Sequence, residues 1–156
     1  MQRFAKSAGV IGLICCLALP GAAFAVGSGD DGDADARLRQ AVAAVEKQDY
    51  RKAISLLEQV LEDDSGHADA LNYLGYSYRK LGNYERALTY YRRALQVNPD
   101  HEGANEYIGE AYLELKQPDN AKAHLDRLAS ICGTSCDAYR DLKKAFDAYQ
   151  AKARGS

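Results

Sequence analysis

The chain has 156 residues, enough for one ordinary domain, and a formal net charge of −2 at pH 7. A near-neutral, slightly acidic balance argues against nucleic acid as a partner, because the phosphate backbone selects basic surfaces. The sequence also has no polybasic cluster of the kind that binds anionic membrane surfaces.

The N-terminal stretch has the layout of a secretory signal peptide. Arg3 and Lys6 provide a basic start, residues 10–19 are apolar and uncharged, and residues 23–25 (Ala-Phe-Ala) form a small-x-small cleavage site. The apolar run is shorter than the roughly 20 residues that span a bilayer. We therefore predict cleavage after Ala25, a periplasmic or secreted location, and no membrane span in the mature chain. An uncleaved N-terminal anchor is the alternative.

Residues 26–33 (VGSGDDGD) are rich in glycine and aspartate and offer almost nothing to bury. We predict that they form a flexible N-terminus of the mature chain. Loss of the two basic residues of the signal peptide also leaves the mature chain more acidic than its precursor.

The stretch from Ala68 to His101 carries apolar, small and aromatic residues at characteristic spacings over one 34-residue period. These residues are Leu71, Leu74, Gly75, Tyr78, Ala87, Tyr91 and Pro99. They match the pattern W-x2-L-G-x2-Y, A-x3-F, P, except that Leu71 stands in the Trp position and Tyr91 in the Phe position. The stretch therefore resembles a tetratricopeptide repeat (TPR), which is a helix–turn–helix unit.

Two further blocks, residues 34–67 and 102–135, continue the same register on either side. The first is weaker and retains Ala41, Ala53, Leu57 and Val60. The third retains Ile108, Gly109, Tyr112, Ala121, Leu125 and Leu128. Residues 136–154 follow as an amphipathic helix with one apolar stripe, which suits a helix that covers the exposed flank of the last repeat.

The resemblance implies an all-α, right-handed α-solenoid of three TPR units with a C-terminal capping helix: seven helices and no strands. Small side chains are expected where the two helices of one repeat cross, because larger ones would force the helix axes apart. These positions are Ala41, Ala53, Gly75, Ala87, Gly109 and Ala121.

TPR arrays bind partners on a concave face formed by the first helix of each repeat. By resemblance, the contact positions are Leu38, Val42, Asp69, Asn72, Tyr76, Arg79, Lys80, Glu106, Glu110 and Glu114. This face would be apolar at the first repeat, polar and aromatic at the second, and acidic at the third. We predict a protein or peptide ligand that lays a basic or extended segment in this groove. A plain solvated helix face and self-association through the edge of the stack are the alternatives.

One TPR subgroup grips the C-terminal carboxylate of chaperones with Lys and Arg in the third repeat. Here that region holds Gly103 and Glu106, so the sequence disfavours that ligand class. There is no Gly-rich phosphate loop, nucleophile elbow or other catalytic constellation of residues. We predict a non-enzymatic scaffold that uses no cofactor and no resident metal.

Of the four cysteines, Cys15 and Cys16 belong to the signal peptide, which leaves Cys132 and Cys136. Residues four apart in a turn or helix lie about 6 Å apart at Cα, within the disulfide range. In an exported chain we predict a structural disulfide that ties the last repeat to the capping helix. The CGxxC segment and the helix after it also resemble small exported TPR proteins of proteobacteria.

A thiol-based metal or redox accessory role for the same two cysteines is the alternative function. Two nearby thiols suit a soft ion such as Cu(I). Against it, zinc usually takes four ligands, and no histidine or further cysteine lies close in sequence.

Overall fold

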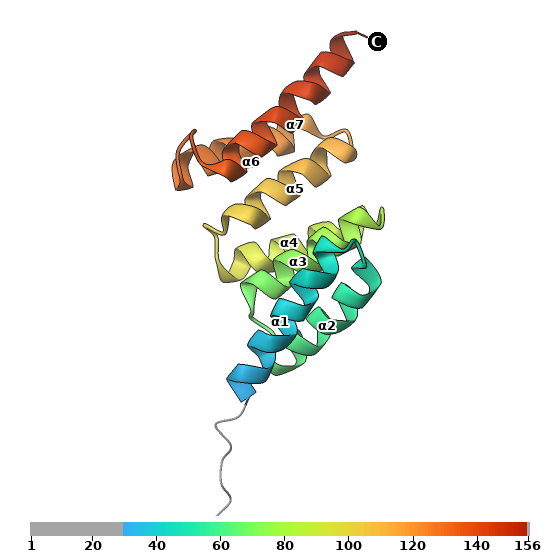
Figure 1. Cartoon of the computed structure of the whole chain (residues 1–156). Coiled ribbons are helices and arrows are strands. Elements are labelled where there is room, and N and C mark those ends of the chain that lie inside the picture. The colour runs from blue at the N-terminus through green and yellow to red at the C-terminus, as the bar shows by residue number, and fades with distance from the viewer. Residues whose placement is uncertain (1–29, 156) are drawn as a thin grey trace, which may run out of the picture.

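The computed structural model describes residues 30–155, and these residues form seven α-helices stacked along the molecule (Figure 1). The helices are α1 (Asp30–Glu46), α2 (Tyr50–Asp63), α3 (Ala68–Lys80), α4 (Tyr84–Val97), α5 (Glu102–Glu114), α6 (Pro118–Ile131) and α7 (Asp137–Arg154). This is the predicted all-α array of three helical hairpins and a capping helix. The predicted signal peptide and residues 26–29 lie outside the described residues.

The first helix begins earlier than the sequence indicated. Residues 30–33 were predicted to be part of a flexible N-terminus, but α1 starts at Asp30. Asp33 lies close to the N-terminus of this helix, where a negative charge is favourable because it complements the helix dipole. That local preference outweighs the helix-weakening effect of Gly32.

The turns within the first two repeats begin their second helices in the same way. Asp49 and Asn83 each accept a hydrogen bond from a backbone N–H three residues ahead, at 3.2 Å in both cases. These side chains satisfy N–H groups that the first turn of a helix leaves unpaired. In the third repeat Pro118 opens α6, where a missing N–H costs nothing.

The turns between repeats are also built alike. The imidazole Nδ1 of His67 accepts from the N–H of Ala70 at 3.4 Å, and that of His101 accepts from the N–H of Ala104 at 3.2 Å. Both histidines hold the last position of their repeat, so helix capping accounts for their presence.

The buried core includes the small residues that were expected where the helices cross. Ala41, Ala53, Ala87 and Ala121 have no exposed surface. A Cβ atom at Gly75 would lie 2.5 Å from Cε1 of Tyr91 on the partner helix of the same repeat, as expected for a tight crossing.

Gly109 differs from this expectation. It was predicted to face the second helix of its own repeat, α6. The nearest side chain is instead Leu142 of α7, whose Cδ2 atom lies 2.5 Å from an added Cβ. Leu142 is fully buried and takes the space that the glycine leaves.

The capping helix α7 does not pack as the first helix of a fourth repeat would. Towards the preceding repeat, α3 packs more against α2 than against α1, and α5 packs more against α4 than against α3. By contrast, α7 packs more against α5 than against α6. Its residues thus join the face that the first helices form. Among residues 30–155, no helix is long and apolar enough to cross a membrane.

Candidate partner-binding groove

A hollow of about 390 Å³ lies between the first helices of repeats one and two. Its lining is Leu38, Arg39, Val42, Ala43, Glu46, Asp69 and Tyr73. The structure therefore brings together Leu38, Val42 and Asp69, three of the predicted contact residues. Sequence reasoning missed Tyr73, which reaches this hollow from α3.

Aromatic rings occupy the middle of the first-helix face. The ring centroids of Tyr76 and Tyr107 lie 5.0 Å apart, and Tyr50 lies 6.3 Å from Tyr76. The Nζ atom of Lys80 lies 5.1 Å from the Tyr76 centroid, and the guanidinium carbon of Arg79 lies 5.4 Å from it. Cation–π contacts of this kind hold both cations against the rings.

Arg79 and Asn72, both predicted contact residues, are committed to the stack. Nη2 of Arg79 lies 2.6 Å from Oε2 of Glu110, and the Arg79 side chain is only 9% exposed. Asn72 is 5% exposed, and its Nδ2 atom would lie 3.2 Å from a Cβ added at Gly103. Neither side chain is open to a partner, because each fills the space between α3 and α5.

Carboxylates gather where α5 meets α7. Glu106, Glu110 and Asp141 line one depression of about 380 Å³ together with Lys144, Ala145 and Ala148. Burial raises the pKa of Glu106 to about 8, and repulsion from Glu110, Asp141 and Asp137 adds to the effect, while Arg79 opposes it. A carboxyl group in this setting gains from a cation placed beside it.

Two more depressions continue this one along the same seam. The first, of about 210 Å³, is lined by Arg79, Glu110, Leu113, Glu114, Ala145 and Tyr149. The second shares Leu113, Glu114 and Tyr149 and adds Lys116, Lys152 and Ala153. We call the three together the α5–α7 furrow. Three carboxyl groups and Lys144 line the Glu106 end, apolar side chains line the middle around Leu113, Ala145 and Tyr149, and Glu114, Lys116 and Lys152 line the other end.

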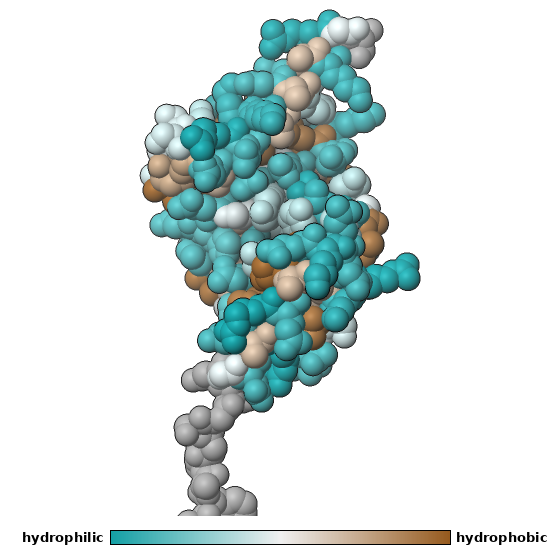
Figure 2. Space-filling model, in the orientation of Figure 1, coloured by the Kyte–Doolittle hydropathy of each residue, from teal (hydrophilic) through white to brown (hydrophobic). Residues whose placement is uncertain are grey.

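The predicted row Glu106, Glu110 and Glu114 is thus present on α5, but it is not uniformly acidic. Arg79 pairs with Glu110, and lysines border Glu114. On the face shown in Figure 2, polar residues predominate and apolar residues occur in small groups. On this side the surface is therefore mainly polar, with local apolar groups rather than a broad apolar patch.

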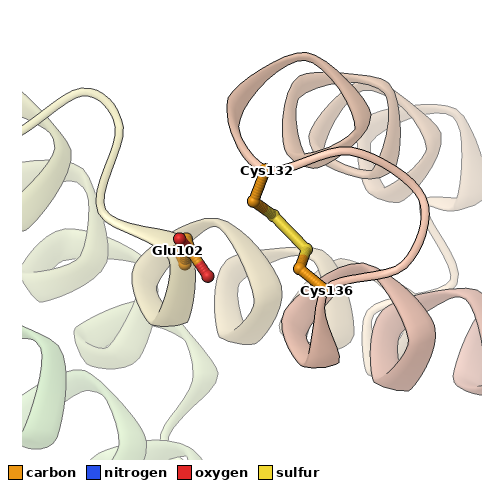
Figure 3. A group of neighbouring side chains, drawn as sticks. All are labelled: Glu102, Cys132 and Cys136. Carbon is orange, nitrogen blue, oxygen red and sulfur yellow. A yellow bond between two sulfur atoms is a disulfide. The ribbon is translucent and has the colours of Figure 1, made fainter.

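Cys132 and Cys136 are joined by a disulfide, with their Cα atoms 5.9 Å apart. Cys132 ends α6 and Cys136 precedes α7, so the bond closes the connection into the capping helix. The carboxylate of Glu102, the first residue of α5, lies beside the two sulfurs (Figure 3). Within residues 30–155, these three side chains are the group whose ligand atoms approach closely enough to hold a metal ion.

Several residues of these sites could not be found by repeat position alone. Asp141, Ala145 and Tyr149 lie on the capping helix, and only its placement over α5 brings them to the furrow. The one signal in the sequence was the amphipathic pattern of this helix, which places Ala145 and Tyr149 on the apolar stripe and Asp141 on the polar side. Glu102 is far from both cysteines in sequence and meets them only through stacking of α5 and α7.

Family comparisons agree with this architecture. A tetratricopeptide repeat profile matches residues 68–101, and a second profile with the same description matches residues 35–67 and 104–135. Together they cover more than half of the chain, which belongs to the tetratricopeptide repeat family. No curated protein sequence matches the chain significantly.

Solved TPR structures share the fold. The Sgt2 TPR domain from Aspergillus fumigatus is 24% identical, with a TM-score of 0.67, over 78% of this chain and 79% of that one. The first TPR domain of RPAP3 (Spaghetti), bound to the HSP90 peptide SRMEEVD, is 18% identical, with a TM-score of 0.69, over 78% and 98%. The type III secretion chaperone SycD of Yersinia enterocolitica, in complex with a peptide of the translocator YopD, is 13% identical, with a TM-score of 0.67, over 76% and 93%.

Proposed function

We propose that this protein is a non-enzymatic scaffold that binds an extended segment of a protein partner on its first-helix face, with the α5–α7 furrow as the main contact. The observation that carries the proposal is the convergence of Glu106, Glu110 and Asp141 beside an apolar stretch. Two of the similar TPR domains hold peptides, which supports a peptide ligand here.

The charge of the furrow selects the kind of segment. The raised pKa of Glu106 reflects burial and neighbouring carboxylates, so a lysine or arginine of a partner would relieve that repulsion. The HSP90 peptide bound by RPAP3 has the opposite character, since SRMEEVD contains three acidic residues. The partner segment is therefore basic.

The spacing along the furrow adds a second requirement. The midpoint between Glu106 and Glu110 lies about 7 Å along the helix from Leu113, at 1.5 Å per residue. In an extended peptide, residues two apart point to the same side and are roughly 6.6–6.8 Å apart. A basic residue followed two positions later by a large apolar one would place its charge near the carboxylates and its apolar side chain near Leu113, Ala145 and Tyr149.

Fluorescence anisotropy tests this with an eight-residue labelled peptide that contains arginine and, two positions later, phenylalanine. We expect it to bind the mature chain, and a peptide with glutamate for arginine to bind at least about tenfold more weakly. The triple variant Glu106→Gln/Glu114→Gln/Asp141→Asn should lose most of the affinity.

The matched control is Glu62→Gln/Glu85→Gln/Asp119→Asn, which makes the same three types of substitution at exposed residues of the second helices α2, α4 and α6. It should bind as the wild type does. If both triple variants weaken binding equally, the furrow is not the site and only the net charge matters. If neither peptide binds, the proposed function is wrong.

The location of the protein is part of the proposal. The signal-like N-terminus supports export to the periplasm and cleavage after Ala25. Mass spectrometry of the protein from a periplasmic fraction should give a mature chain that begins at Val26. An intact chain held in the membrane fraction would contradict cleavage.

A further inference from the structure

The group formed by Glu102, Cys132 and Cys136 has no part in the furrow. The carboxylate oxygen and the two sulfurs all lie within 4.8 Å of one another (Figure 3). Cys132 and Cys136 are half-buried, whereas Glu102 is exposed. The three residues come from three helix ends: the start of α5, the end of α6 and the residue before α7. Packing of α7 on α5 holds these ends together.

We propose that the reduced form of this protein binds one Zn²⁺ ion through the thiolates of Cys132 and Cys136 and the carboxylate of Glu102. The disulfide first takes two electrons and two protons from a dithiol reductant, which becomes a disulfide itself. Zinc then displaces the protons of the two thiols. Exchange with a disulfide oxidant, which accepts the two electrons and becomes a dithiol, would re-form the Cys132–Cys136 bond and release the ion.

The backbone around the two cysteines allows the disulfide to be replaced by two thiolates bound to zinc. Two thiolates bound to one tetrahedral zinc at about 2.3 Å are separated by roughly 3.8 Å. The Cα atoms of Cys132 and Cys136 are 5.9 Å apart, so the sulfurs can reach that separation by side-chain rotation. Gly133, with φ of 80°, forms the turn between them in a conformation that favours glycine.

The electrostatics favour anionic ligands at this place. Cys136 precedes the first turn of α7, and Glu102 begins α5. Helix N-termini carry partial positive charge, which stabilises a thiolate or a carboxylate nearby. Two helix ends therefore place partial positive charge beside the anionic groups that a metal ion would bind.

The chemistry of the third ligand selects the ion. Copper(I) is soft and prefers sulfur ligands, whereas zinc also accepts carboxylate oxygen. Two sulfurs and one carboxylate therefore favour zinc over the copper suggested by the cysteine pair alone. Three protein ligands leave a fourth tetrahedral position for water.

Zinc competition with a chromophoric chelator tests the site on the mature chain. The protein is reduced with a water-soluble phosphine, which supplies the two electrons and becomes a phosphine oxide, and oxygen is excluded. We expect one zinc per reduced chain and none at this site in the oxidised chain. Cobalt(II) in place of zinc should give the ligand-field bands of a tetrahedral site with sulfur ligands.

Substitutions of the three ligands distinguish specific zinc binding at this site from non-specific zinc binding. Cys132→Ser/Cys136→Ser should abolish binding in the reducing buffer. Glu102→Gln should weaken it at least about tenfold, since loss of even an outer-shell partner commonly costs that much. Glu85→Gln, which removes an exposed carboxylate from the first turn of α4, is the matched control and should leave the zinc affinity unchanged. Circular dichroism confirms that each variant remains helical.

Two results would overturn the proposal. If reduced wild type binds zinc no more tightly than the double serine variant, no thiol site exists. If Glu102→Gln binds zinc as tightly as wild type, the third ligand and the argument for zinc are lost. Peptide binding in the α5–α7 furrow does not depend on either result.

Discussion

The crossing of α3 and α4 gives the sharpest stability prediction. An alanine at Gly75 would place its Cβ 2.5 Å from Cε1 and 2.6 Å from Cδ1 of Tyr91. The Tyr91 ring is fully buried, so it cannot swing into solvent to make room. We expect Gly75→Ala to destabilise the array, although alanine is the better helix former.

Two opposing effects determine how much Gly75→Ala lowers the free energy of unfolding. Overpacking of a dense core costs about 1–3 kcal/mol, and ring carbons at this distance place the cost in the upper half of that range. Replacing glycine with alanine inside a helix returns about 1 kcal/mol. The net loss in the free energy of unfolding should be about 1–2 kcal/mol.

The first repeat supplies the compensating change. At the corresponding positions of α1 and α2 it carries Ala41 and Leu57, both fully buried. Tyr91→Leu should therefore make room for a methyl group at residue 75. In the background of Tyr91→Leu, Gly75→Ala should be neutral or stabilising by up to about 1 kcal/mol, because only the helix propensity term remains.

Urea unfolding followed by far-ultraviolet circular dichroism measures the four members of this double-mutant cycle. The predicted coupling energy between the two substitutions is about 2 kcal/mol. The double variant should therefore have a larger free energy of unfolding than the sum of the two single effects would give. A Gly75→Ala variant as stable as the wild type would refute the reasoning. So would strictly additive effects, since they would mean that the two residues do not compete for the same space.

Two more predictions concern charged residues around the furrow. The raised pKa of Glu106 means that the folded chain retains a proton that the unfolded chain loses, so stability falls as pH rises from the ordinary glutamate pKa towards about 8. Glu106→Gln should therefore be more stable than wild type in urea melts at pH 9 and lose that advantage below pH 4; an equal difference at both pH values would contradict this. Arg79→Met should cost about 3 kcal/mol in the same assay because Glu110 loses its partner, whereas Lys80→Met, at an exposed position, should stay within roughly 0.5 kcal/mol.

The repeat register and the hairpin order could be predicted because they depend on local spacing. Small residues such as Ala41 and Gly75 recur at fixed positions, and each marks a crossing of helices whatever the neighbouring side chains do. The row of glutamates on α5 followed from helix geometry in the same way.

The rest of the site depends on contacts between residues far apart in sequence. Repeat position suggested that Arg79 would be open to a ligand, but its pairing with Glu110 requires a particular stacking of α3 on α5. The lining of the furrow by Asp141 follows from the seating of Leu142 over Gly109, which places α7 on α5. No local pattern encodes such a choice between two neighbouring helices.

The most direct test of the account is to map the basic peptide onto the mature chain by two-dimensional NMR. We predict that its addition shifts the backbone amide signals of α5 and α7 most, around Glu106, Glu110 and Ala145, and that those of α2, α4 and α6 change little. Shifts concentrated on the second helices, or spread evenly over the molecule, would contradict the assignment of the α5–α7 furrow as the partner-binding site.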